Sequence, residues 1–207
     1  MTPEAVTFLL VVLFPLLVGS WRVSLLGLAL QGLLLGWMAQ TQLRELSASE
    51  LLPIADALLL RGIAAPAVLY RILERQGTPS RNEVIPPNLF VWALAGVLVL
   101  IAFRFSELPG LNLPNDRRAI LGVAAAALLI GIFVVATRDS AINQMIGLLR
   151  IDNAIMLFEL GAPRRTPLAL EAGLSAVYVL TLATFSLYLN RIARLTAAPA
   201  EDEGHAL

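Results

Sequence analysis

The segment Gly147–Leu157, GLLRIDNAIML, carries three strongly polar side chains inside a stretch that is otherwise apolar. Arg150, Asp152 and Asn153 fall within four consecutive positions. A carboxylate near a guanidinium can take up and release a proton, and it can equally form a structural ion pair. Ionisable side chains within membrane-spanning helices are costly and usually face other protein or water. The chemistry open to this segment therefore depends on whether it spans a membrane.

Helical geometry separates these charges onto different faces. At about 100° per residue, Arg150 shares a stripe with Asn143, which Gln144 follows in the sequence. Asp152 shares a different stripe with Glu159, and it points roughly 200° away from Arg150. We therefore expect this helix to be enclosed by protein on two sides. Glu159 could instead reach water from the helix end, and Asp152 could serve in structural pairing or in proton handling.

The last apolar segment places Glu171, Ser175 and Tyr178 at positions i, i+4 and i+7, which lie on one helical stripe. Glu171 lies about one turn inside the segment, where the positive end of the helix dipole favours a carboxylate. It could therefore be an interfacial carboxylate. Alternatively, it could form one end of a hydrated polar path that faces the helix at 141–160.

The third apolar segment contains Asp56 and Arg61, which are five residues apart and do not stack on an ideal α-helix. Pro66 cannot donate a hydrogen bond to the carbonyl of Gly62, so we expect a kink or break near 62–66. Discontinuous helices with a charge near the break recur at ion sites in transporters. The alternative is a packed kink in which a carboxylate neutralises Arg61.

The composition places these charges in an integral membrane protein. Of the 207 residues, 58% are hydrophobic and 14% are charged, against about 25% charged residues in soluble domains. Mean hydropathy is +0.79. The formal net charge is zero, and no basic tract indicates binding to nucleic acid. Cysteine is absent and the one histidine is His205, so the sequence predicts no metal site, no cofactor and no catalytic site of its own.

Seven apolar segments are expected to be membrane-spanning helices, which makes the predicted fold all-α and polytopic. They cover roughly residues 5–19, 23–39, 51–73, 88–104, 118–137, 141–160 and 168–190. Together they form one transmembrane domain over residues 1–194, and a flexible polar tail follows at 195–207. Seven spans put the termini on opposite sides. The loop arginines, six on the N-terminal side against seven on the other, favour a cytoplasmic C-terminus.

Several stretches of the chain resemble component E of the hydrogenase-4 and formate hydrogenlyase-type membrane complexes. They are WRVSLLGLALQGLLLG at 21–36, LLLRGIAAPAVLY at 58–70, INQMIGLLRIDNAIMLFELGAP at 142–163 and LALEAGLSAVYVL at 168–180. The resemblance extends over most of the chain. The C-terminal helices, 118–190, are also similar to chain K of respiratory complex I.

The resemblance implies a non-catalytic subunit in the membrane arm of an energy-converting assembly, located in a prokaryotic cytoplasmic (inner) membrane. Its partners would be the lipid bilayer, antiporter-like membrane subunits, and hydrogenase-like or other redox subunits that carry the metal centres. Such subunits contribute to a polar axis along which protons or sodium ions move. Asp152 and Glu171 match acidic residues of the family, and Arg61 takes the place of a lysine.

Two departures from the family pattern concern carboxylates. The acidic residue expected in the last helix falls on Val177, and the one that chain K carries in its middle helix falls on Leu149. The resulting hypothesis assigns proton-path roles to Asp152, Glu159, Glu171 and Asp56, charge-tuning roles to Arg61 and Arg150, and polar support to Asn143, Gln144, Asn153, Ser175 and Tyr178. A purely structural assembly scaffold is the alternative, and a stand-alone secondary transporter is a third hypothesis.

Overall fold

The computed structural model describes residues 3–18, 20–42, 48–76, 89–107, 113–138, 140–162 and 167–197. Every regular element in these ranges is a helix, which confirms the all-α prediction for the described part of the chain. The helices are α1 (Pro3–Val18), α2 (Trp21–Thr41), α3 (Ala48–Ala55), the π-helix η1 (Asp56–Ala64), α4 (Ala65–Gln76), α5 (Leu89–Ser106), α6 (Asn115–Thr137), α7 (Ala141–Gly161) and α8 (Leu168–Ala197). Each predicted segment corresponds to one helix, except that 51–73 corresponds to the continuous run of α3, η1 and α4.

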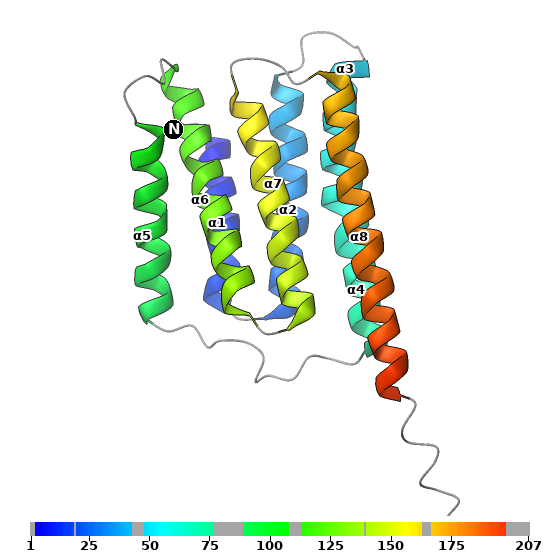
Figure 1. Ribbon diagram of the computed structural model, residues 1–207. Helices are drawn as coiled ribbons and strands as arrows, with labels where there is room; N and C mark the ends of the chain where they lie inside the picture. Colours follow the sequence, from blue (N-terminus) through cyan, green and yellow to red (C-terminus); the bar gives the residue numbers. More distant parts are fainter. Residues whose placement is uncertain are drawn as a thin grey trace, which may run out of the picture.

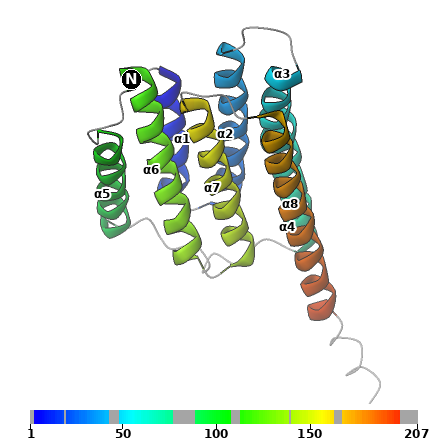
Figure 2. The ribbon, with the colours of Figure 1, turned by 45° about the horizontal axis from the view of Figure 1, so that its top comes forward.

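The helices lie side by side in a bundle (Figure 1). Helix α5 forms one edge of the bundle and the pair α4 and α8 forms the other, with α6 and α7 between them (Figure 2). Helix α7 packs against α6, α2 and α8. This placement agrees with the expectation that a helix with polar residues on two faces is enclosed by protein on both.

Five helices are long and apolar enough to cross a membrane. They are Trp21–Thr41, Glu50–Glu74, Leu89–Ser106, Asn115–Thr137 and Leu168–Arg191. The apolar part of α1, Pro3–Leu16, is shorter. Helix α7 has 21 residues, about the length of a span, but its polar side chains reduce its hydropathy. Length and composition therefore support five of the seven predicted spans. Helix α8 continues to Ala197, and the rest of the predicted tail, 198–207, lies outside the described residues.

Glycines fix how α7 lies against α6. A Cβ atom added at Gly131 would lie 2.7 Å from Ile151 Cγ1, and one added at Gly147 would lie 2.6 Å from Val135 Cγ2. Small residues at such positions let two helix backbones approach closely. Because Ile151 occupies the contact with α6, the rotation of α7 about its axis is set, and with it the direction of the neighbouring polar side chains.

The third apolar segment departs from α-helical geometry. The N–H of Ala65 donates to the carbonyl of Leu60, five residues earlier, and the whole of Asp56–Ala64 is a π-helix. The irregularity predicted near 62–66 is present, but it begins earlier and is a π-helix within a continuous helix, not a break. Pro66 lies in the first turn of α4, where α-helical geometry resumes. Such π-helical segments are rare and are frequently found at functional sites.

Candidate functional site

The π-helix η1 brings Asp56 and Arg61 into direct contact. Residues five apart are neighbours in a π-helix because its hydrogen bonds join residues i and i+5. Arg61 Nε donates to Asp56 Oδ2 at 2.6 Å, and the two side chains are only 4% and 5% exposed. The sequence left this pairing open, and the π-helical backbone brings it about.

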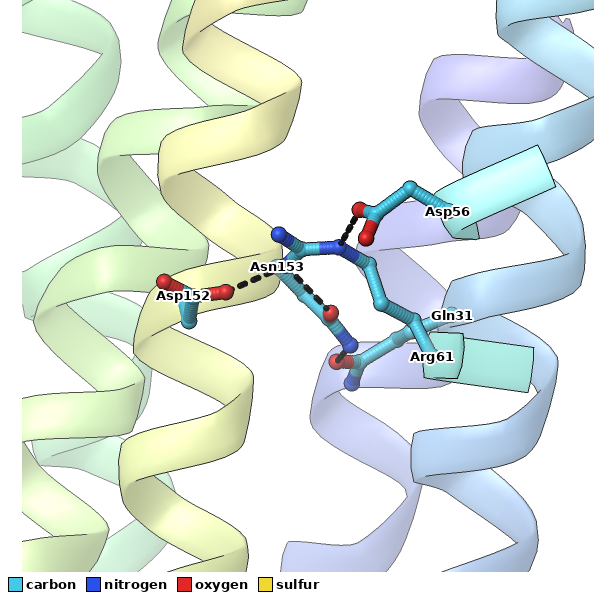
Figure 3. Close-up of polar contacts among 5 residues, drawn as sticks. All are labelled: Gln31, Asp56, Arg61, Asp152 and Asn153. Carbon is cyan, nitrogen blue, oxygen red and sulfur yellow. Dashed lines mark hydrogen bonds and ion pairs between the residues drawn. The ribbon is translucent and has the colours of Figure 1, made fainter. Parts of the chain in front are cut away.

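Helix α7 supplies a second carboxylate to the same guanidinium. Arg61 Nη1 donates to Asp152 Oδ2 at 2.5 Å and to Asn153 Oδ1 at 3.2 Å. Arg61 therefore lies between carboxylates from two different helices, as Figure 3 shows. The side chain of Asp152 is 27% exposed, against 5% for Asp56. Asp152 is thus the carboxylate that remains accessible from outside this group of residues.

Two uncharged side chains complete the site, which we call the charge cluster and define as Gln31, Asp56, Arg61, Asp152, Asn153 and Tyr178. Gln31 Oε1 accepts a hydrogen bond from Asn153 Nδ2 at 3.5 Å (Figure 3). The guanidinium carbon of Arg61 lies 4.5 Å from the centroid of the Tyr178 ring, within the range of a cation–π interaction. The cluster therefore joins four separate elements, α2, η1, α7 and α8.

Close approach of two helices brings these residues together. A Cβ atom added at Gly32 of α2 would lie 2.3 Å from the backbone N of Gly62 and 2.5 Å from the carbonyl carbon of Arg61. No side chain can be accommodated at such distances, so glycine at this position is what allows α2 to lie directly against η1. This contact places Gln31 and Arg61 at the same level of the bundle.

The charge cluster lies at about half the length of the helices that form it. Gln31 is the central residue of α2, and Asp152 adjoins the central residue of α7. Charged groups at this depth in membrane proteins either pair with one another or mark an ion pathway. Two carboxylates and one guanidinium carry a formal charge of −1 when all are ionised. One bound proton or sodium ion would balance that charge.

Three atoms of the charge cluster have no hydrogen-bond partner within the described ranges: Gln31 Nε2, Asp56 Oδ1 and the hydroxyl oxygen of Tyr178. Buried polar groups are nearly always paired with protein or with water. Buried waters typically bridge such groups. These atoms therefore give the cluster the capacity to bond to water.

Glu159, Glu171 and Ser175 lie toward one end of the bundle and are partly buried. Glu159 is seven residues beyond Asp152, and Glu171 is seven residues before Tyr178, about 10 Å along each helix axis. Helix α7 ends and α8 begins at the same end of the bundle (Figure 1). Both carboxylates are therefore on the same side of the charge cluster.

The contacts of Arg150 lie outside the charge cluster. It is 3% exposed, and its Nη2 donates to the carbonyl of Ser24 at 3.3 Å. Asn143 lines the same cavity as Arg150, and Gln144 Nε2 donates to the carbonyl of Arg138 at 2.8 Å. These three predicted residues form a separate polar region, in agreement with the expectation that Arg150 and Asp152 point to different faces.

Gln31 is the member of the charge cluster to which sequence reasoning assigned no role. The available signal was an amide side chain inside the apolar segment 23–39, and the structure places it among fully buried residues. At the two positions where the family pattern has further carboxylates, Leu149 is 1% exposed in the core and Val177 is 58% exposed. Neither contributes a polar group to the cluster.

Comparison with known proteins finds a similarity to one uncharacterized protein. No family model matches the chain, and no solved structure matches it. The uncharacterized protein Rv0085 of Mycobacterium tuberculosis (strain ATCC 25618 / H37Rv) is 29% identical over 145 residues. The match covers 67% of this chain and 63% of the relative, so the chain spans less than two thirds of that protein's length. Because that protein is uncharacterized, the likeness assigns no function to this chain.

Proposed function

We propose that the chain is a non-catalytic membrane-arm subunit of an energy-converting, complex I-like or hydrogenase-type assembly. In this role its buried charges contribute to translocation of protons, or of sodium ions, beside antiporter-like subunits. The observation that carries the proposal is the sharing of Arg61 between Asp56 and Asp152 at mid-depth of the bundle. Such an arrangement is expensive in a membrane, and ion pathways are the common reason for its presence.

The positions of the charges support a path that enters or leaves through α7 and α8. Asp152 is the more exposed carboxylate of the cluster, and Glu159 and Glu171 lie beyond it toward one end of the bundle. A proton that reaches Asp152 would be attracted by the unbalanced negative charge of the cluster. Arg61 would remain protonated throughout, so it would act as a fixed charge and the carboxylates would carry the proton.

The proposal includes a finer topology. Helices α1 and α7 would cross the membrane together with the five more apolar helices, which gives seven spans. The polar side chains of α7 would be tolerated because α6, α2 and α8 surround it. The chain would lie in a prokaryotic inner membrane with its C-terminus in the cytoplasm, and redox centres would belong to partner subunits.

A structural scaffold is the second candidate, and two observations favour it. Arg61 makes hydrogen bonds with both carboxylates. Positions 149 and 177 lack the carboxylates expected from the family that the chain resembles. Carboxylates that are ion-paired with a shared guanidinium can hold helices together without moving ions. In that case the chain would join larger subunits and seal the space between them.

Asp152→Asn distinguishes the two functions, because it removes a proton acceptor and keeps the shape of the side chain. A tagged full-length chain is purified from its own membranes with its partner subunits, and the complex is placed in liposomes. Proton uptake is measured per unit of redox turnover. We expect a loss of at least about tenfold in Asp152→Asn, and no change in Glu107→Gln, whose carboxylate is 56% exposed.

Two results would oppose the proposal. A complex that contains Asp152→Asn and pumps normally per assembled unit supports the scaffold function. A chain that purifies without partner subunits rules out both functions, because each requires a larger assembly.

A further inference from the structure

A second polar site lies between α1, α2, α6 and α7. Its cavity has a volume of about 20 Å³, and its polar lining consists of Ser20, Trp21, Ser24, Arg138, Asn143 and Arg150. This volume accommodates a group the size of one water molecule or one oxygen atom. All of these residues except Arg150 are partly exposed. Ser20 precedes α2 and Arg138 follows α6, so the cavity lies toward the end of the bundle at which α2 and α7 begin (Figure 1).

Arg150 is a buried cation that forms no ion pair with any carboxylate of the described ranges. The residue is 3% exposed, and its Nε has no hydrogen-bond partner among the residues that the structure describes. Burial of an unpaired guanidinium is strongly unfavourable. An anion in the cavity that Arg150 lines would supply the missing charge and an acceptor for Nε.

Arg138 brings a second positive charge to the same cavity. It follows the last residue of α6, and it is close enough to Arg150 for the two charges to repel each other. Partial burial lowers the pKa of Arg138, but arginine remains protonated in proteins. Two like charges that face one cavity, with no carboxylate bonded to either in the described ranges, create a strongly positive potential there.

The local backbone also favours an anion. Helix α2 begins beside the cavity, and the side chain of its N-cap residue, Ser20, makes no capping hydrogen bond. The first turn of a helix presents N–H groups without helical acceptors, together with the positive end of the dipole. A Cβ atom added at Gly27 would lie 3.3 Å from Arg150 Nη2, so glycine at this position leaves room for the guanidinium.

We propose that this cavity binds a phosphate group, with one anionic oxygen held by Arg150, Arg138 and the first turn of α2. Phosphate suits the site because it offers several acceptor oxygens to guanidinium groups. Trp21 also lines the cavity, and tryptophan is typical of the membrane–water interface. The phosphate therefore belongs to an anionic lipid headgroup or to inorganic phosphate, and basic pockets between membrane helices bind such headgroups.

The full chain in mild detergent provides the test. Bound phosphatidylglycerol is counted by native mass spectrometry, and thermal unfolding is followed with phosphatidylglycerol or with inorganic phosphate. We expect one retained lipid or one phosphate-dependent rise in Tm. Affinity should fall at least about tenfold in Arg150→Gln and in Arg138→Gln, since each removes a charged donor. Arg104→Gln is the matched control, because that side chain is 85% exposed and paired with Glu107.

A competition experiment distinguishes the two possible sources of the phosphate group. If millimolar inorganic phosphate displaces the lipid or alone raises Tm, free phosphate is the ligand. If the chain retains phosphatidylglycerol and phosphate does neither, the lipid headgroup is the ligand. The proposal is wrong if the chain binds neither probe, or if all three variants retain phosphatidylglycerol equally. Arg138→Gln alters a partly exposed side chain at a helix end, so it keeps the test decisive even where Arg150→Gln fails to fold.

Discussion

Asp56 and Arg61 are in contact although five residues separate them, with Arg61 Nε 2.6 Å from Asp56 Oδ2. On an α-helix these side chains would point about 140° apart. The contact exists because the backbone from Asp56 to Ala64 is π-helical. The backbone therefore turns Arg61 so that it faces Asp56 within its own helix and Asp152 on α7.

Arg61→Gln is expected to destabilise the fold strongly. The substitution leaves two carboxylates without their shared cation, and loss of one partner of a buried ion pair costs about 3–5 kcal/mol. The free energy of unfolding is measured by titration with SDS in mixed micelles. Arg104→Gln removes an exposed ion pair and should change stability by less than about 1 kcal/mol.

The double variant Asp56→Asn/Arg61→Gln should be more stable than Arg61→Gln alone. Neutralising Asp56 removes one of the uncompensated charges, so the effects of the two changes are not additive. Strict additivity of the two free-energy changes would contradict a direct interaction between these residues.

Gly32→Ala is expected to separate α2 from η1. The new Cβ atom would lie 2.3 Å from the backbone N of Gly62, so the helices must move apart, which costs about 1–3 kcal/mol. Gly96→Ala on α5 is the matched control, since nothing lies within 4 Å of an added Cβ atom there. That control should be neutral or stabilising by about 0.5–1 kcal/mol. Equal stability of the two variants would argue against the close contact.

Tyr178 interacts with the charge cluster mainly through its ring and less through its hydroxyl group. The guanidinium carbon of Arg61 lies 4.5 Å from the ring centroid, and the hydroxyl oxygen has no hydrogen-bond partner in the described part of the chain. Tyr178→Phe should therefore retain stability, whereas Tyr178→Leu should lose about 0.5–2 kcal/mol. Thermal unfolding measures both. A large loss in Tyr178→Phe would mean that the hydroxyl group, and not the ring, holds Arg61.

Hydropathy predicted the positions of the helices closely, because apolar segments report which residues can be buried or face lipid. The predicted segment 141–160 corresponds to Ala141–Gly161, and 118–137 corresponds to Asn115–Thr137. The π-helix was not predicted, because apolar content carries no information about whether a carbonyl bonds to residue i+4 or i+5. The Gly62 and Pro66 signals indicated an irregularity in the right helix but not its form.

The sequence predicted most members of the charge cluster, but it did not predict the contacts between them. Asp152, Arg61 and Tyr178 were selected because polar side chains in apolar segments need partners. Their pairing joins residues 91 positions apart, and local spacing cannot determine such a contact. It depends on how α7 is rotated against α6, and on the absence of a side chain at Gly32. Both are properties of helix packing.

Asn153 should be coupled to Gln31, and this pair provides the last prediction. Asn153 is fully buried, accepts from Arg61 Nη1 at 3.2 Å and donates to Gln31 Oε1 at 3.5 Å. Asn153→Leu leaves the Gln31 carbonyl oxygen without its donor, and an unsatisfied buried group costs about 1–3 kcal/mol. Adding Gln31→Leu should recover part of this loss, because it removes the stranded amide. A double-mutant cycle of unfolding free energies measures the coupling, and a coupling energy of zero would show that the two amides do not interact.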